Sequence, residues 1–249
     1  MLGLILNGGS AMARDSIRVL FVGNSLTYYN DLPGMVRAVY KTVAPNLQLT
    51  TEMLASGGAL IRDHIDSGHL QRILATQHFD VVVLQELGGF PLCAADFHGC
   101  ADSPRALKEA VAFVRIAGAR PILYGTWQPD PNLQPELSRA AREIATDLDA
   151  DFADIGGAIH GVNDTKTPML DAKGHPSPAG SWLAALVLVK AITMHDLPPT
   201  APSPICEPDW TGTGPSEDSL ASTQPQPPTR CFSLTKDLSK ELQRVANQS

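Results

Sequence analysis

Residues 17–23 read IRVLFVG, a short apolar run rich in β-branched side chains that ends at a glycine. A run of this length without polar alternation predicts a strand buried on both faces. Leu47–Leu54 alternates apolar and polar residues like a strand, a short last strand is predicted at Phe152–Ile155, and further buried strands are predicted at Phe79–Leu84 and Pro121–Tyr124. Buried strands of this kind belong to parallel sheets that helices cover on both sides.

Helical segments alternate with these strands. They are predicted at Pro33–Thr42, Ala59–Thr76, Ser103–Ala117, Gln134–Leu148 and Ser177–His195. Ser103 and Ser177 are the expected N-caps of two of them, each followed by a proline in the first turn. The alternation predicts an α/β fold, a doubly wound three-layer sandwich around a parallel sheet of about five strands. Functional residues of such folds lie on loops at the carboxyl ends of the strands.

The composition changes after Leu197. Nine of the 20 prolines lie between Pro198 and Pro228, among many serines and threonines. We therefore predict one domain over residues 14–197 and a Pro-rich extension over 198–249, packed on that domain or trailing from it. A short closing helix is expected at Leu234–Ala246.

Charge and hydropathy exclude several functions. The 249-residue chain carries 26 acidic against 19 basic residues, a net charge of -7, with no cluster of lysine or arginine. That balance argues against nucleic-acid binding. The longest apolar run, Trp182 to Val189, is too short to span a membrane. No P-loop or dinucleotide fingerprint is present, which argues against nucleotide binding.

The cysteines and the N-terminus bear on the compartment. Cys93, Cys100, Cys206 and Cys231 lack the spacing of zinc ligands, and we favour the disulfides Cys93–Cys100 and Cys206–Cys231 over free thiols. Residues 1–13 are apolar and end in small residues. They resemble a partial export signal or a remnant of an expression vector, and we expect them to lie outside the folded domain. The expectation is a secreted or periplasmic protein.

The first strand is followed by Gly23-Asn24-Ser25-Leu26-Thr27. A serine just after a buried strand can present its hydroxyl, and the turn can aim backbone N–H groups at the same point, as an oxyanion hole requires. The competing interpretation is that Ser25 only caps the next helix.

A second group of residues, Asp171-Ala-Lys-Gly-His175-Pro-Ser177, precedes the last predicted helix of the domain. An imidazole is the natural base for a serine, and a nearby acid can hold the ring in the required tautomer. His175 and Asp171 are therefore the candidate base and acid.

Together these motifs resemble the SGNH (GDSL-type) hydrolase superfamily of esterases, lipases and carbohydrate deacetylases, over about residues 17–195. The resemblance implies a flavodoxin-like sandwich, with Ser25 as nucleophile and as one oxyanion donor. Asn24 stands where the name-giving motif has Asp. The second block corresponds to Ala55–Ala59 and assigns a further oxyanion donor to Gly58, with Gly57 adjacent, although either glycine could simply permit a turn.

Two blocks depart from the family pattern. The third lacks its Gly-x-Asn-Asp, and Gln85, next to Glu86, is the candidate replacement donor, since its amide carries N–H groups. Glu86 is expected either to contact substrate or to be a buried structural acid. The fourth block has Asp171 four residues before His175 instead of three, which leaves Asp164 or a Ser–His dyad as alternatives.

Trp127, after the fourth strand of the sheet, is expected to line the mouth of a substrate pocket or else to pack in the core. The sequence predicts a serine hydrolase that cleaves short-chain acyl esters, such as acetyl esters of a small molecule or carbohydrate, with no metal or organic cofactor. The alternative is a non-catalytic module of the same fold that binds acyl or glycan ligands.

Overall fold

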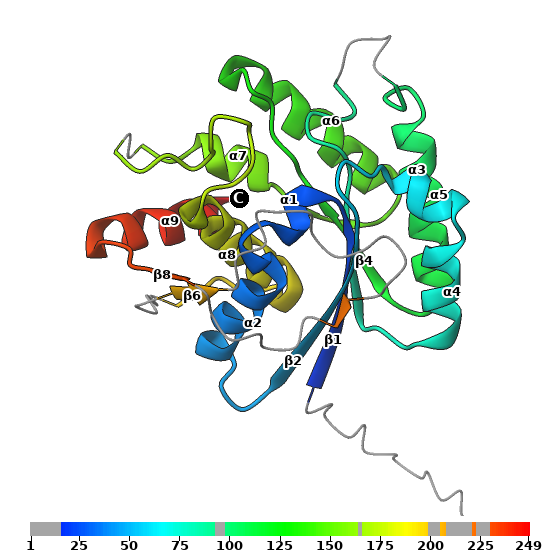
Figure 1. The fold of residues 1–249 in the computed structure, drawn as a ribbon, viewed down its shortest axis with the longest axis horizontal. Coiled ribbons are helices and arrows are strands. Elements are labelled where there is room, and N and C mark those ends of the chain that lie inside the picture. Colours follow the sequence, from blue (N-terminus) through cyan, green and yellow to red (C-terminus); the bar gives the residue numbers. More distant parts are fainter. Residues whose placement is uncertain (1–15, 93–97, 164–165, 199–204, 208–220, 223–229) are drawn as a thin grey trace, which may run out of the picture.

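The computed structural model describes residues 16–92, 98–163, 166–198, 205–207, 221–222 and 230–249. A six-stranded sheet forms the centre of this described part, in the order β5-β4-β3-β1-β2-β7. Figure 1 shows β1, β2 and β4 of this sheet with helices around them. The five parallel strands are β1 (Ser16–Gly23), β2 (Gln48–Ala55), β3 (Val81–Gln85), β4 (Arg120–Tyr124) and β5 (Asp151–Ala153). The predicted doubly wound α/β sandwich with five parallel strands is confirmed.

The strand order places a topological switch point beside β1. The chain runs from β1 to β2 on one side and then to β3 on the other side of β1. The two connections leave in opposite directions, so a crevice opens between the carboxyl ends of β1 and β3. That edge carries Gly23 and Gln85 as the last residues of their strands.

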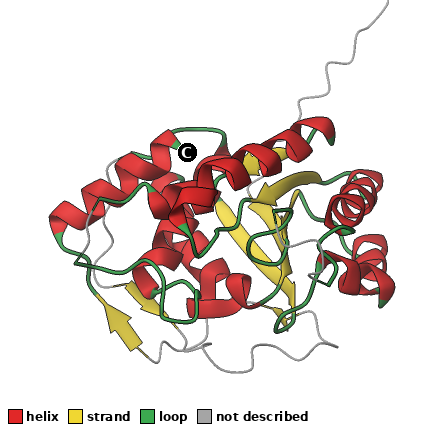
Figure 2. Cartoon of the chain, turned by 90° about the horizontal axis from the view of Figure 1, so that it is seen from above, coloured by secondary structure: helices red, strands yellow, loops and turns green. Residues whose placement is uncertain are grey.

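Alternating side chains of β1 explain why this strand is apolar throughout. Val19 and Phe21 belong to one buried cluster, and Leu20 and Val22 belong to a second cluster. The first cluster lies under α2 (Leu32–Val43), α7 (Ile155–His160), α8 (Pro178–Thr193) and α9 (Lys236–Gln248). The second lies under α3 (Ile61–Asp66), α4 (His69–Thr76), α5 (Ser103–Ile116) and α6 (Gln134–Asp147). Figure 2 shows the strands between these two helical layers.

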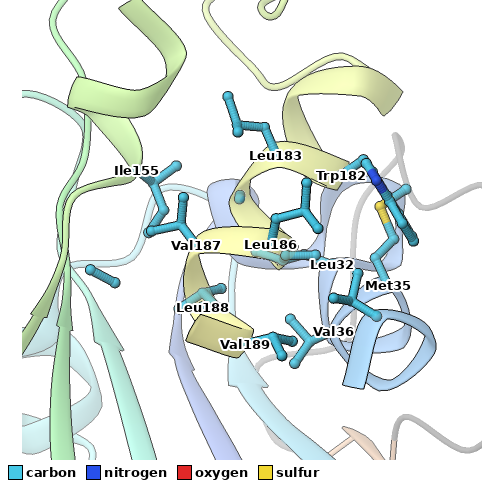
Figure 3. Close-up of a cluster of buried hydrophobic side chains, with 14 of the residues drawn as sticks. Leu32, Met35, Val36, Ile155, Trp182, Leu183, Leu186, Val187, Leu188 and Val189 are labelled. Carbon is cyan, nitrogen blue, oxygen red and sulfur yellow. The ribbon is translucent and has the colours of Figure 1, made fainter. Parts of the chain in front are cut away.

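Helix α8 is buried on all sides. Its side chains pack against the sheet and against α2, whose Leu32, Met35 and Val36 lie beside it in Figure 3. A helix enclosed in this way needs no polar face, which accounts for the apolar run that begins at Trp182. Ser177 caps it as predicted, with its hydroxyl accepting from the Gly180 N–H at 3.1 Å. None of the described helices is long and apolar enough to span a membrane.

Three local predictions need correction. The helix expected over 59–76 is two helices, because the chain turns at Gly68, whose φ is +70°. Ser103 is the first residue of α5 and not its cap, since Asp102 holds that position. The last strand ends at Ala153, and the chain then enters α7. Three short helical turns were not predicted: α1 (Ser25–Tyr28), η1 (Tyr29–Asp31) and η2 (Pro131–Leu133).

The C-terminal segment returns to the domain. Helix α9 buries Leu242 and Ala246 against the first cluster, and Gln243 Nε2 donates to the Leu197 carbonyl at 3.0 Å. Strand β7 (Ala221–Ser222) adds an antiparallel edge to β2, while β6 (Ile205–Glu207) and β8 (Arg230–Phe232) form a separate ribbon.

Two of the cysteines can be placed relative to each other. The register of β6 and β8 sets Cys206 opposite Cys231. Cys100 and Cys231 each belong to a disulfide, and no cysteine among the described residues is free. Cys93 lies outside the described residues, as do residues 1–13, so the two pairings and the export signal remain predictions.

Candidate active site

Ser25 lies at the switch point. It follows β1 by two residues and begins the short helix α1, where it is half-buried. Asn24 caps this turn, because its side-chain oxygen Oδ1 accepts from the Leu26 N–H at 3.1 Å. The predicted capping role therefore falls to Asn24, which leaves the Ser25 hydroxyl to make other contacts.

The histidine loop brings a base to this hydroxyl. His175 Nε2 lies 3.0 Å from Ser25 Oγ, although the two residues are 150 positions apart in the chain. A proton can pass between atoms at this distance. The predicted pair of Ser25 and His175 is thus brought together by the fold.

Asp171 does not contact the imidazole through its carboxylate. Its Oδ1 accepts from two backbone N–H groups, those of Lys173 at 2.8 Å and of His175 at 2.9 Å. His175 Nδ1, where a triad acid would bind, is buried and has no hydrogen-bond partner among the described residues. Asp171 thus closes the loop that carries His175. The alternative acid, Asp164, lies outside the described residues.

The electrostatics of the imidazole favour its neutral form. Partial burial lowers the pKa of His175, Asp171 raises it by charge attraction, and Lys173 lowers it. The net direction is downward because desolvation penalises the charged ring most. A neutral imidazole can accept a proton near neutral pH, as a general base must.

Asn24 links the Ser25 turn to the glycine turn after β2. Its Nδ2 donates to the Ala59 carbonyl at 2.9 Å. The Ala59 N–H in turn donates to the Ser56 carbonyl and so closes the glycine turn. Gly58 within this turn is exposed and has a φ of +71°, a conformation that suits glycine. A Cβ on Gly58 would meet no atom within 4 Å, so the backbone angle, and not crowding, requires glycine there.

Gln85 does not have the predicted role of oxyanion donor. The residue is fully buried, and its Nε2 donates to Asn24 Oδ1 at 3.0 Å and to the Glu86 carbonyl. Its Oε1 accepts from the Asn24 N–H at 2.9 Å and from the Thr27 hydroxyl at 2.8 Å. Both N–H groups of the amide already donate to other protein groups, so they are not left for a substrate oxygen. Gln85 instead stabilises the turn that carries Ser25, through Asn24 and Thr27.

Close packing at this point explains Gly23. A Cβ there would lie 2.4 Å from Gln85 Oε1 and 2.6 Å from Thr27 Oγ1. Only glycine lets the amide reach the turn.

Glu86 is the buried structural acid of the two predicted alternatives, not a substrate contact. It is 5% exposed, and its Oε1 accepts from the N–H groups of Leu87 at 2.8 Å and Ile61 at 3.3 Å. Its Oε2 accepts from the Ser103 hydroxyl at 3.2 Å. Burial raises the pKa of Glu86 to about 7, against these hydrogen bonds, which lower it.

Trp127 is buried and holds the histidine loop. Its indole Nε1 donates to the Gly174 carbonyl at 2.9 Å, and its ring packs in the first cluster. The predicted packing role is therefore found, together with a polar contact to the residue before His175. The prediction that Trp127 lines a pocket mouth is not borne out by this burial.

Two residues next to the site were not predicted. Asn30, at a φ of 56°, donates from Nδ2 to the Pro176 carbonyl and to Ser181 Oγ, both at 2.8 Å. Tyr29 stacks on the His175 ring, with centroids 4.0 Å apart and ring planes 6° from parallel. Neither has a sequence signal, because their partners lie about 150 residues away in the chain.

The arrangement fits acyl transfer. It combines a hydroxyl within reach of a neutral imidazole with a glycine turn that Asn24 ties to the turn of that hydroxyl. Within the described residues, no group of three His, Cys, Asp or Glu side chains could hold a metal ion.

The fold is that of the SGNH hydrolases, a class of α/β proteins with this five-stranded parallel sheet. No family model and no curated protein matches the chain. Among solved structures, a protein described as an SGNH hydrolase from Slackia heliotrinireducens is 28% identical, with a TM-score of 0.59 over 71% of this chain and 99% of that one.

Axe2, an acetylxylan esterase from Geobacillus stearothermophilus, is 19% identical, with a TM-score of 0.56 over 73% of this chain and 95% of that one. Variants of Axe2 described as catalytic mutants replace a serine, an aspartate and a histidine.

Proposed function

We propose that this protein is a serine esterase in which Ser25 is the nucleophile and His175 is the general base. The observation that carries the proposal is the 3.0 Å contact between Ser25 Oγ and His175 Nε2 at the switch point of the sheet. The imidazole takes the hydroxyl proton as Oγ attacks the ester carbonyl. The same imidazole then protonates the leaving alcohol, and water releases the acyl group from Ser25.

The oxyanion is stabilised by backbone N–H groups of Ser25 and of the turn at Gly58. Loss of one such donor typically costs about 2.7–4 kcal/mol of barrier. Gln85 and Asn24 fix the two turns relative to each other through the hydrogen bonds that join them. The hole is thereby formed before substrate arrives.

The proposed substrates are short acyl esters, acetyl esters of carbohydrates first. Structural neighbours that are acetylxylan esterases support this choice, and no metal or organic cofactor is required by the chemistry. We further propose an oxidising compartment, secreted or periplasmic, since no described cysteine is free. Alkylation before reduction should then modify none of the four cysteines, and prompt modification of all four would exclude the two disulfides.

Hydrolysis of p-nitrophenyl esters from acetate to palmitate tests the proposal. Wild type should turn over acetate best, while Ser25→Ala and His175→Ala should retain only background hydrolysis. Ser16→Ala, at the exposed start of β1, and His195→Ala, after α8, are the matched controls. Equal rates in wild type and Ser25→Ala would reject the esterase and favour the module that only binds acyl or glycan ligands.

A further inference from the structure

The backbone around His175 is held from three sides. Asp171 Oδ1 accepts from the His175 N–H, Trp127 Nε1 donates to the Gly174 carbonyl, and Asn30 Nδ2 donates to the Pro176 carbonyl. These contacts fix where the loop lies. They do not fix the imidazole, which can still rotate about its bond to Cβ.

The polar contacts of the ring itself are few. Nε2 meets Ser25 Oγ, whereas Nδ1 is buried without a hydrogen-bond partner among the described residues. In serine hydrolases with a full triad, the contact at Nδ1 orients the ring and stabilises the imidazolium that forms during attack. Among the described residues no group takes this position at Nδ1, and the remaining contact of the ring is at its face.

The face of the ring has such a partner. The Tyr29 ring lies parallel to it, 6° from coplanar and 4.0 Å away between centroids. An aromatic face attracts a cation through the negative charge density above the ring, more strongly where water is excluded. Tyr29 and His175 are both half-buried, so their contact is partly shielded from water.

Tyr29 is well placed for this role by the chain. It follows α1, which Ser25 begins, and precedes Asn30 and Asp31, whose φ values are 56° and 47°. Two successive residues in this rarely used region turn the chain sharply. One short segment therefore carries the nucleophile, the stacked ring and the Asn30 clamp on the histidine loop.

We propose that Tyr29 is the positioning residue of His175. The stacked ring of Tyr29 sets the plane of the imidazole and favours the imidazolium that forms when Ser25 gives up its proton. The role rests on the proposed esterase mechanism. The charged groups that act on the ring are Asp171, which favours the cation, and Lys173, which opposes it. Tyr29 adds a further attraction for the imidazolium, at the face of the ring on which it stacks.

The test compares Tyr29→Phe, which keeps an aromatic face, with Tyr29→Leu, which fills space without one. The pKa of His175 is measured by NMR, with His175→Ala used to assign its signals, so the reading does not depend on activity. Tyr29→Leu should lower that pKa by about half a pH unit or more, as loss of a cation–π contact implies. Tyr29→Phe should leave it unchanged.

Kinetics supply the second reading. Tyr29→Leu should lower kcat by about tenfold with little change in KM, and Tyr29→Phe should restore it to within about twofold of wild type. An unchanged pKa in Tyr29→Leu, or a Phe variant as impaired as the Leu variant, would overturn the role of the ring face. If wild type itself has no more activity than Ser25→Ala, the esterase proposal fails, and the NMR result still decides whether Tyr29 acts on His175.

Discussion

Asp171 Oδ1 lies 2.9 Å from the backbone nitrogen of His175 and also accepts from Lys173, so its carboxylate shapes the loop and does not touch Nδ1. This contact separates two roles that the sequence cannot distinguish. A triad acid acts on the side chain of the histidine, whereas a loop acceptor acts on its backbone.

Two substitutions at Asp171 distinguish these roles. Asp171→Asn keeps an oxygen that can accept from both N–H groups, so we expect kcat/KM to fall about tenfold or less, through loss of the nearby charge. Asp171→Ala removes the acceptor and should cost at least about tenfold more. Steady-state kinetics on p-nitrophenyl acetate give both numbers. A loss of about 10⁴-fold in the Asn variant, as triads show, would restore Asp171 as the acid.

Asn24→Asp tests the link between the two oxyanion turns. Asp is the residue of the related motif, but here it would replace Nδ2, which donates to the Ala59 carbonyl, with a second oxygen. Asn24 is 1% exposed, so two acceptors would meet in a buried site. We expect a loss of about 2–3 kcal/mol in unfolding free energy at pH 8, together with reduced kcat.

Urea unfolding at pH 8 and pH 5 measures this cost. The loss should shrink at pH 5, because a protonated Asp can again donate to Ala59. An Asp variant as stable as wild type at pH 8 would mean that the Asn24–Ala59 contact contributes nothing.

Glu86 makes the stability of the protein depend on pH. Its pKa is raised from 4.5 to about 7, so the native state keeps a proton that the unfolded state releases within this window. The free energy of unfolding therefore falls as pH rises from about 4.5 to about 7, by about 3 kcal/mol at 1.36 kcal/mol per pH unit.

Glu86→Gln should remove this contribution. Its Oε1 can still accept from Ile61 and Leu87, and its amide can donate to Ser103 Oγ. Buried Asp31 shifts in the same direction, to about 6, so the comparison is the difference between variant and wild type at each pH. That difference should grow from pH 4.5 to pH 7, and a constant difference would show that Glu86 does not titrate there.

The pH dependence of activity should follow His175. The imidazole must be neutral to accept the Ser25 proton, and burial lowers its pKa from 6.5. The acid limb of kcat/KM is therefore expected below pH 6.5. Lys173→Ala removes a charge that lowers this pKa and should move the limb to higher pH. A limb above pH 6.5 in wild type would contradict the neutral buried base.

The fold was predictable because β1, β3 and β4 are largely apolar on both faces. Val19 and Leu20 point to opposite clusters, so the strand lacks polar alternation and reads as buried from sequence alone. The break at Gly68 was missed because apolar spacing continues through both α3 and α4. Turns as short as α1 hold too few residues for any periodicity to show.

The site was predictable only in part. Ser25 and His175 lie in motifs that resemble those of a known superfamily, so the sequence alone points to them. The fold brings the two side chains together. Gln85 was placed correctly at a strand end, but its sequence position does not reveal that Asn24 uses its amide. The role of Tyr29 was not predicted. Its contact with His175 depends on a turn at Asn30, and no local sequence pattern indicates that turn.

The most direct test of the account is covalent labelling with a fluorophosphonate, read by intact mass and peptide mapping. An activated serine attacks the phosphorus and keeps the label. We expect one label per chain, on Ser25, in wild type and in His195→Ala, and none in Ser25→Ala or His175→Ala. Labelling at another residue, or equal labelling of wild type and His175→Ala, would contradict a nucleophile at Ser25 activated by His175.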